Sequence, residues 1–176
     1  MAVRHARANE FDQLREIRLA SLAMDPKAFG GTHAHEASLQ SDWWTNWASK
    51  SELGTSQRTF VLEARDGSWL GLALIRLDDE TEHAAVLNAM WVAPEARGRR
   101  AAGMLCDSCA AWATAHGCRE LTLTIMVGNH SARRAYEAAD FAVCGETTWE
   151  RDGEVLDQFV MVRSLKPEGA ADPDAA

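Results

Sequence analysis

The most informative stretch of the sequence spans residues 90–103 and reads Met90-Trp91-Val92-Ala93-Pro94-Glu95-Ala96-Arg97-Gly98-Arg99-Arg100-Ala101-Ala102-Gly103. An apolar, strand-like run ends at Pro94, and a helical run begins near residue 99. The first backbone amides of a helix have no partner inside it, and the helix dipole adds positive potential there. This junction therefore predicts an anion site, in which Gly98 lets the backbone approach a ligand and Arg97, Arg99 and Arg100 add charge.

Other interpretations of this junction stay open on these residues alone. A turn rich in glycine and arginine also occurs as a plain solvated cap before a helix. A P-loop is excluded because no Gly-Lys-Ser/Thr follows. A nucleic-acid patch is disfavoured by the formal net charge of −8 and by the lack of nearby exposed aromatic residues. A pyrophosphate is the occupant that best suits the pattern.

On both sides of the junction, the sequence predicts an α/β chain with a mixed sheet and helices on both of its faces. The expected strands cover residues 3–8, 58–65, 69–77, 84–92, 121–127, 141–149 and 155–163. The expected helices run from an N-cap at Asn9 to Pro26 and over residues 36–49, 99–116 and 131–139. The strand–helix–strand unit from Ala84 to Val127 is expected to be a right-handed parallel crossover.

Composition sets further limits on the class of protein. The 176 residues are enough for one domain, expected over residues 1–165, with residues 166–176 as a disordered tail. The first residues lack the apolar core of a signal peptide, and no apolar run reaches membrane-spanning length, so we expect a cytoplasmic protein. The four cysteines are expected to be free, buried thiols, at positions 106, 109, 118 and 144. No second cysteine pair accompanies the Cys-x-x-Cys at 106–109, so no metal site is expected.

Residues 97–102 resemble the acetyl-CoA signature of the GNAT superfamily, Gln/Arg-x-x-Gly-x-Gly/Ala, preceded by that family's Val-x-Pro-x-x-Arg approach. Arg97 matches the first position and Ala102 the last, while Arg100 replaces the central glycine. A second stretch, residues 129–141, is similar to the family's Asn-x-x-Ala-x-x-x-Tyr-x-x-x-Gly-Phe run. Asp140 stands there in place of glycine, a mild departure because Asp tolerates the left-handed conformation.

The resemblance implies a GNAT fold, with a mostly antiparallel central sheet and one parallel crossover. It implies an N-acetyltransferase that moves acetyl directly from acetyl-CoA, its co-substrate, to a primary amine. Asn129 would bind the pantetheine arm, and Tyr136 would be the catalytic acid that protonates the departing thiolate. The residues expected to bind acetyl-CoA are Met90, Trp91, Val92, Arg97, Gly98, Arg99, Arg100, Ala101, Ala102, Gly103 and Asn129.

The general base is not identified by the sequence. The strands on which relatives often carry a glutamate read Ala85-Val86-Leu87-Asn88-Ala89-Met90 and Leu121-Thr122-Leu123-Thr124-Ile125, without an acid. Candidates on expected loops and turns are His33, His35, Glu36, Asp78, Asp79, Glu82 and His83, and a water chain without a dedicated base is an alternative. The cluster of Trp43, Trp44 and Trp47 predicts either core packing or an aromatic wall for a cationic or planar acceptor.

The acceptor amine also stays open. A small molecule such as an antibiotic, polyamine or amino-acid derivative is the first expectation, and a peptide or protein N-terminus is the second. A non-catalytic acetyl-CoA sensor is a third possibility, suggested by Arg100 and the missing base, although Asn129 and Tyr136 favour an enzyme. The acidic turn at residues 78–82 predicts a cationic acceptor, with a solubilising turn as the alternative. Nucleic acid and membrane are not expected as partners, and a homodimer is compatible with the family.

Overall fold

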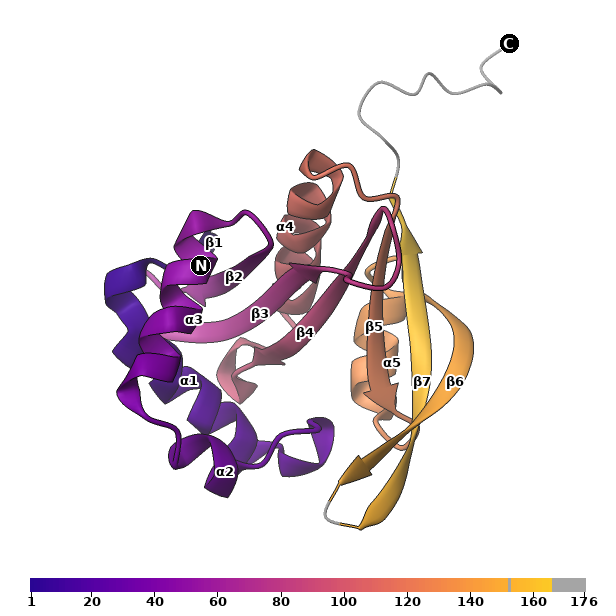
Figure 1. Ribbon diagram of the computed structural model, residues 1–176, viewed down its shortest axis with the longest axis horizontal. Helices are drawn as coiled ribbons and strands as arrows, with labels where there is room; N and C mark the ends of the chain where they lie inside the picture. Colours follow the sequence, from indigo (N-terminus) through magenta and orange to yellow (C-terminus); the bar gives the residue numbers. More distant parts are fainter. Residues whose placement is uncertain (152, 166–176) are drawn as a thin grey trace.

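The fold is centred on one seven-stranded sheet with the strand order β1-β2-β3-β4-β5-β7-β6 (Figure 1). It comes from a computed structural model that describes residues 1–151 and 153–165. The strands are β1 (Ala2–His5), β2 (Gln57–Glu63), β3 (Trp69–Leu77), β4 (Ala84–Val92), β5 (Glu120–Met126), β6 (Ala142–Arg151) and β7 (Glu154–Ser164). Every neighbouring pair is antiparallel except β4 and β5, which are parallel. The expected mixed sheet with one parallel crossover is confirmed.

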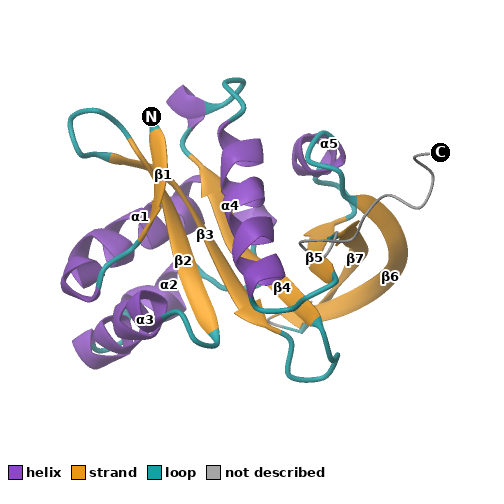
Figure 2. Cartoon of the chain, turned by 90° about the horizontal axis from the view of Figure 1, so that it is seen from above, coloured by secondary structure: helices purple, strands orange, loops and turns teal. Residues whose placement is uncertain are grey.

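Helices cover both faces of the sheet (Figure 2). One face carries α4 (Ala101–Ala115) and α5 (His130–Glu137), and the other carries α1 (Phe11–Met24), α2 (His33–Ala37) and α3 (Ser41–Leu53). Short 3-10 turns precede or link these helices, namely η1 (Ala8–Glu10), η2 (Pro26–Ala28) and η3 (Pro94–Ala96). Within the described ranges, no helix is both long and apolar enough to cross a membrane.

Each face has its own hydrophobic core. Helix α4 is apolar almost all round because it lies across β2, β3 and β4, and its Leu105, Cys106 and Cys109 are fully buried. On the other face, Leu14 and Trp44 pack with Val61 and Leu72 of the sheet. The two cores hold the sheet rigidly between α4 and the N-terminal helices.

Strands β4 and β5 separate soon after they begin. They pair only from Ala84–Val86 to Glu120–Thr122. On its other side, β4 contains a bulge: Leu72 pairs with Trp91 but Leu74 pairs with Asn88, so β4 has one extra residue. Ala89 lies in this bulge with a φ of 48°. The bulge bends β4 away from β5 and opens the sheet toward the C-terminal ends of both strands.

Two predicted helix boundaries were wrong. The expected helix over residues 36–49 is two helices, because Thr32 caps α2 by accepting a hydrogen bond from the amide of His35 and Ser38 ends it. Asn9 is not the cap of the first helix. Instead η1 leads into α1, and Glu10 binds the Arg7 amide and the Arg4 guanidinium, each at 2.8 Å.

Left-handed residues mark the ends of several elements, and Asp140 has the left-handed backbone that its place in the family motif predicts. Gly67 turns the β2–β3 hairpin with a φ of 85°, Gly117 ends α4 with a φ of 77°, and Asp140 follows α5 with a φ of 64°. The four cysteines are free; three are buried as expected, but Cys144 lies exposed on the edge strand β6. The predicted disordered tail lies outside the described residues.

Replacing Leu105 by alanine tests the α4 core. Leu105 of α4 is fully buried against the sheet, so Leu105→Ala is expected to lower the free energy of unfolding by about 3 kcal/mol. Leu53→Ala is the matched control, because Leu53 is 71% exposed, and a change within about 0.5 kcal/mol is expected. Urea denaturation measures both, and equal effects would contradict the proposed core.

Candidate active site

The predicted anion site is a cradle of backbone amides between η3 and α4, formed by residues 97–103. Gly98 and Arg100 both have left-handed backbones, with φ values of 74° and 59°. The first backbone hydrogen bond back into this turn is from the Met104 amide to the Arg100 carbonyl, at 3.0 Å. A Cβ atom at Gly98 or Gly103 would meet open space. The amides before Met104 are therefore available to a ligand, which suits a pyrophosphate.

The left-handed backbone at Arg100 explains the glycine that the family signature has at this position. Arg100 is the N-cap of α4, and its φ of 59° and ψ of 12° are left-handed rather than right-handed helical values. Left-handed geometry costs a residue with a side chain roughly 1–2 kcal/mol. Arg99 and Arg100 are exposed at the mouth of the cradle.

Arg97 has a different position from the other cradle arginines. Its guanidinium binds Asp25 at 2.6 Å and the Val92 carbonyl at 2.9 Å. The indole Nε1 of Trp91 donates to the same Asp25 oxygen at 2.7 Å. The side chains of Arg97 and Trp91 thus fix the end of α1 against the cradle. Asp25 had no signal in the sequence beyond its place before Pro26.

The other residues expected on β4 lie along its open edge. Met90 and Val92 point toward α4, where Met90 Sδ is 3.8 Å from Cys106 Sγ, whereas Trp91 packs with the N-terminal helices. Beyond Val86, the described part of the chain offers β4 no pairing partner on the side of β5. An extended ligand with amide groups could pair with this edge as an added strand does.

Asn129 is the N-cap of α5. Its Oδ1 accepts hydrogen bonds from the Ala132 amide and the Ser131 hydroxyl, both at 3.2 Å, which leaves the Nδ2 group free to donate. Asn129 lines a pocket of about 810 Å³, and Asp25, at the end of α1, lines the same pocket. Because Asp25 binds Arg97, this pocket adjoins the cradle.

Tyr136 lies on α5 against α4 and is 9% exposed. Its ring packs edge-on against Phe141, with centroids 5.6 Å apart. Burial and the neighbouring Cys106 and Cys109 raise the pKa of the Tyr136 phenol well above its usual value. Tyr136 is therefore protonated at neutral pH, although it is not among the residues lining either pocket.

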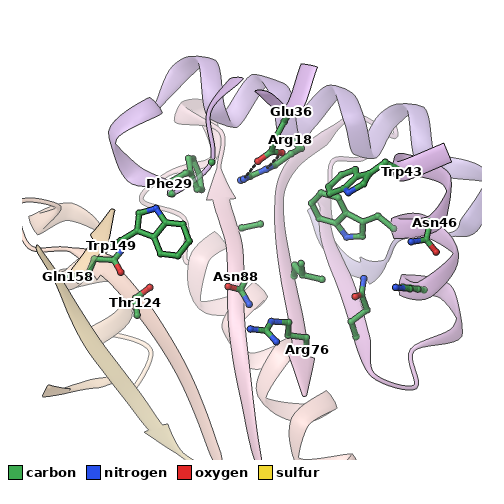
Figure 3. Close-up of a pocket in the computed structure, with 17 residues that line it drawn as sticks. Arg18, Phe29, Glu36, Trp43, Asn46, Arg76, Asn88, Thr124, Trp149 and Gln158 are labelled. Atoms are coloured by element: carbon green, nitrogen blue, oxygen red, sulfur yellow. Dashed lines mark hydrogen bonds and ion pairs between the residues drawn. The ribbon is translucent and has the colours of Figure 1, made fainter. Parts of the chain in front are cut away.

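A second pocket, of about 530 Å³, lies on the opposite face of the sheet, where α1, α2 and α3 pack (Figure 3). Asn88 and Ala89 of β4 and Thr124 of β5 form its floor beside the gap between the strands. The bulge makes two consecutive residues, Asn88 and Ala89, face this pocket. We call it the acceptor-side pocket.

The tryptophan cluster of α3 packs in the core and also reaches the acceptor-side pocket; its role as a wall for an acceptor stays a prediction. Trp44 is fully buried, and Trp47 is 7% exposed and donates from Nε1 to the Thr59 hydroxyl at 2.8 Å. Trp43, 41% exposed, lines the acceptor-side pocket, as does Trp149 from β6. Sequence reasoning missed Trp149 because it lies far away along the chain.

Of the seven candidate bases, only Glu36 lines the acceptor-side pocket. It is 8% exposed, so the expectation of a solvated loop was wrong for this residue. Two hydrogen bonds join it to Arg18, Nη2 to Oε1 at 2.6 Å and Nε to Oε2 at 2.9 Å. The Thr32 cap starts α2 early enough to turn Glu36 inward toward α1.

The remaining candidates lie elsewhere. His33 and His35 are exposed, and residues 78–83 form the turn before β4. The cradle follows the other end of that strand, so the acidic turn is remote from it. Asp79 of this turn lies 3.4 Å from Arg76, which lines the acceptor-side pocket, so the cationic acceptor stays a prediction.

Comparison with known proteins identifies the family. A sequence model described as the Acetyltransferase (GNAT) family matches residues 9–141, and the chain belongs to this family. It is therefore an acyltransferase by family, with acetyl-CoA as co-substrate. No curated protein matches the sequence.

Solved structures share the fold at low sequence identity. A GNAT acetyltransferase from Streptococcus pneumoniae has a TM-score of 0.78 and 20% identity, over 93% of this chain and 98% of that one. A phosphinothricin acetyltransferase from Sinorhizobium meliloti, in complex with acetyl-CoA, has a TM-score of 0.75 and 21% identity, over 99% of this chain and 96% of that one. A spermidine N-acetyltransferase from Vibrio cholerae, in complex with CoA and spermine, has a TM-score of 0.74 and 16% identity, over 94% of this chain and 96% of that one.

Two variants of Arg100 separate its backbone from its charge. Both Arg100→Gly and Arg100→Ala remove the guanidinium, but only glycine relieves the left-handed strain. We expect Arg100→Gly to have a free energy of unfolding about 1 kcal/mol higher than Arg100→Ala, measured by thermal or urea denaturation. An alanine variant as stable as the glycine variant would argue against a left-handed residue here.

Asp25→Asn tests the link between α1 and the cradle. Loss of the charge weakens the bonds to Arg97 and Trp91, so the KM for acetyl-CoA is expected to rise roughly fivefold, or about 1 kcal/mol for a partly exposed pair. Asp12→Asn, an exposed change on the same helix, serves as the control and is expected to leave KM unchanged. A KM unaffected by Asp25→Asn would show that the cradle does not need this link.

Proposed function

We propose that the protein transfers the acetyl group of acetyl-CoA directly to the primary amine of a small molecule. The observation that carries the proposal is the separation of β4 from β5 beyond Val86. The cradle follows the end of β4, and the acceptor-side pocket includes Asn88 and Ala89 of the same strand and Thr124 of β5. Two substrates entering from opposite faces would meet in this gap. Such an arrangement favours direct transfer, because neither substrate has to leave before the other binds.

The residues of this chain fit acetyl-CoA. The amides of residues 98–103 and the exposed Arg99 and Arg100 would hold the pyrophosphate. The open edge of β4 from Leu87 to Val92 would pair with the amides of the pantetheine arm, and Asn129 Nδ2 would donate to the same arm. The thioester would then lie near the gap.

Transfer requires three contributions from the protein. Holding the amine and thioester together in attack geometry supplies several kcal/mol. An ordinary alkylammonium, with a pKa near 10.4, must lose a proton at a cost of about 4–5 kcal/mol at neutral pH. Asn88, Thr124 and Gln158 line the pocket at the gap and would accept hydrogen bonds from the amine or from a water that carries its proton away. Tyr136 would return a proton to the thiolate.

Contacts on one side of the acceptor-side pocket support a small molecule over a peptide. Arg151 of β6 donates to the carbonyls of Pro26 and Phe29, at 3.2 and 2.9 Å, and ties the β6–β7 hairpin to the loop after α1. Trp149 packs beside Gly30, where a Cβ would be 3.1 Å from its Nε1. These contacts bridge the groove that an extended peptide would occupy. Two of the structural relatives are likewise named for small amines, phosphinothricin and spermidine.

Calorimetric titration with acetyl-CoA tests the first half of the proposal. We expect a dissociation constant in the micromolar range, roughly −8 kcal/mol in binding free energy. A panel of small amines, followed by release of the CoA thiol, tests the second half. Binding without turnover on any amine would favour the acetyl-CoA sensor, and no binding at millimolar acetyl-CoA would exclude both functions.

Tyr136→Phe is expected to lower kcat by about 10- to 1000-fold while the affinity for acetyl-CoA changes little, because a general acid acts in the chemical step. Steady-state kinetics and calorimetry measure the two effects. Unchanged kcat would mean that another group or water supplies the proton.

The pH profile gives a second test of Tyr136. An acid acts only while protonated, and the raised pKa of the buried phenol keeps Tyr136 protonated beyond its ordinary value near 10. We therefore expect kcat to show no fall on the alkaline side up to about pH 10, within the range where the protein stays folded. A fall in kcat near pH 8 that disappears in Tyr136→Phe would contradict the raised pKa of this phenol.

A further inference from the structure

The acceptor-side pocket is positively charged in a protein that is acidic overall. The chain has 26 acidic and 18 basic residues. Among the described residues lining this pocket, the charged ones are Arg18, Lys50, Arg76 and a single carboxylate, Glu36. A pocket with the average charge of this chain would be acidic. The excess of basic residues in this pocket therefore suggests a role in binding its ligand.

The one carboxylate is already neutralised. Both oxygens of Glu36 accept hydrogen bonds from Arg18, and the pair is buried. The backbone of Gly31 closes over it so tightly that a Cβ there would overlap Glu36 Oε1. Glu36 is therefore not free to bind an ammonium group without breaking a buried ion pair, which is strongly unfavourable.

A hydrogen-bond donor remains at the buried end of the pocket, and positive charge remains at its open end (Figure 3). At the buried end, Arg18 is 7% exposed and its Nη1 has no hydrogen-bond partner among the described residues. At the open end, Arg76 makes only a 3.4 Å contact with Asp79, whose side chain is 91% exposed. Lys50 also lines the pocket and has no salt bridge in the described chain. Asn88, at the gap between β4 and β5, lies between the two ends.

We propose that the acceptor is a small amine that also carries an anionic group, such as a carboxylate or phosphonate, and that Arg76 and Lys50 hold this group. This inference rests on the proposed acetyl transfer. The amine lies at Asn88 and Thr124 beside the gap, and the half-exposed Trp43 and Trp149 cover the body of the molecule. The buried Arg18 adds to the positive potential without being able to leave Glu36.

Charge complementarity decides between this class of acceptor and a polyamine. A polyamine in the pocket would place further ammonium groups against Arg76, Lys50 and Arg18, with no free carboxylate within the lining to compensate. Ammonium groups inside one pocket with these cations are repelled by them. A carboxylate instead accepts charge-assisted hydrogen bonds, which are about twice as strong as neutral ones. The pocket thus selects for one anionic group and against additional cations.

The test uses matched acceptors that share one body. Each set contains an amino acid, its carboxamide and its decarboxylated amine, with spermidine as the cationic extreme. Thiol release gives kcat/KM for each, divided by the fraction of unprotonated amine at the assay pH, because the carboxamide has the more acidic ammonium. We expect the amino acid to exceed both analogues that lack the carboxylate by at least about tenfold, the size of one charged hydrogen bond.

Two variants locate the anion. Arg76→Gln and Lys50→Gln are expected to lower kcat/KM for the anionic acceptor by about tenfold, mainly through KM, and to leave the carboxamide within about twofold. Arg65→Gln is the matched control, since Arg65 is exposed in the turn at the other end of the β2–β3 hairpin. It is expected to change neither substrate.

The outcomes separate this inference from the proposed function. Equal or better turnover of carboxamides, decarboxylated amines or spermidine would overturn the anionic acceptor and leave acetyl transfer intact. An equal loss on charged and uncharged acceptors in Arg76→Gln would also overturn it. Acetyl-CoA binding with no turnover of any amine would instead remove the proposed function itself.

Discussion

The pairing that β4 does not make with β5 is the constraint on which the site depends. The two strands are hydrogen bonded through Val86 and Thr122 and then diverge, while β5 stays paired with β7 along its whole length. Backbone groups without partners are costly wherever they are shielded from water. The open edge of β4 is therefore stable only beside solvent or a ligand with its own amides. Both the cradle and the acceptor-side pocket meet the sheet at this edge.

The cradle is held by side chains that do not themselves face a phosphate. Asp25 joins Arg97 and Trp91, so the end of α1 and the turn before α4 move as one unit. Arg97 also binds the carbonyl of Val92, the last residue of β4. This explains why an arginine can lead the signature: its guanidinium connects strand, turn and neighbouring helix, and leaves the following amides free.

The local elements could be predicted because their periodicity and turn residues are written in the chain. Gly117 and Asp140 marked helix ends, and the order of the two family motifs placed the cradle and α5. The bulge at Ala89 could not be predicted, because alanine gives no sign of a positive φ and residues 84–92 have the pattern of a regular strand. The Arg18–Glu36 pair could not be predicted either, since it depends on where α2 begins.

The charge of the acceptor side shows the same limit. The acidic turn at residues 78–82 precedes β4, and adjacency in sequence suggested that it faces the site. In three dimensions it lies at the end of the strand remote from the cradle, and the pocket lining comes mostly from elements distant in sequence. Which charges line the pocket is decided by the packing of α1, α3 and β3 against one another, and the net charge of the chain does not reveal it.

Hydrogen–deuterium exchange with and without CoA tests the central claim most directly. In the free protein, the amides of residues 98–103, which precede the first hydrogen bond of α4, are expected to exchange quickly, as are those on the open edge of β4. Saturating CoA is expected to slow both segments, while the exposed turn at residues 65–68 stays unchanged as an internal control. Protection of neither segment, despite measurable CoA binding, would contradict the claim that the cradle and the open strand edge form the acetyl-CoA site.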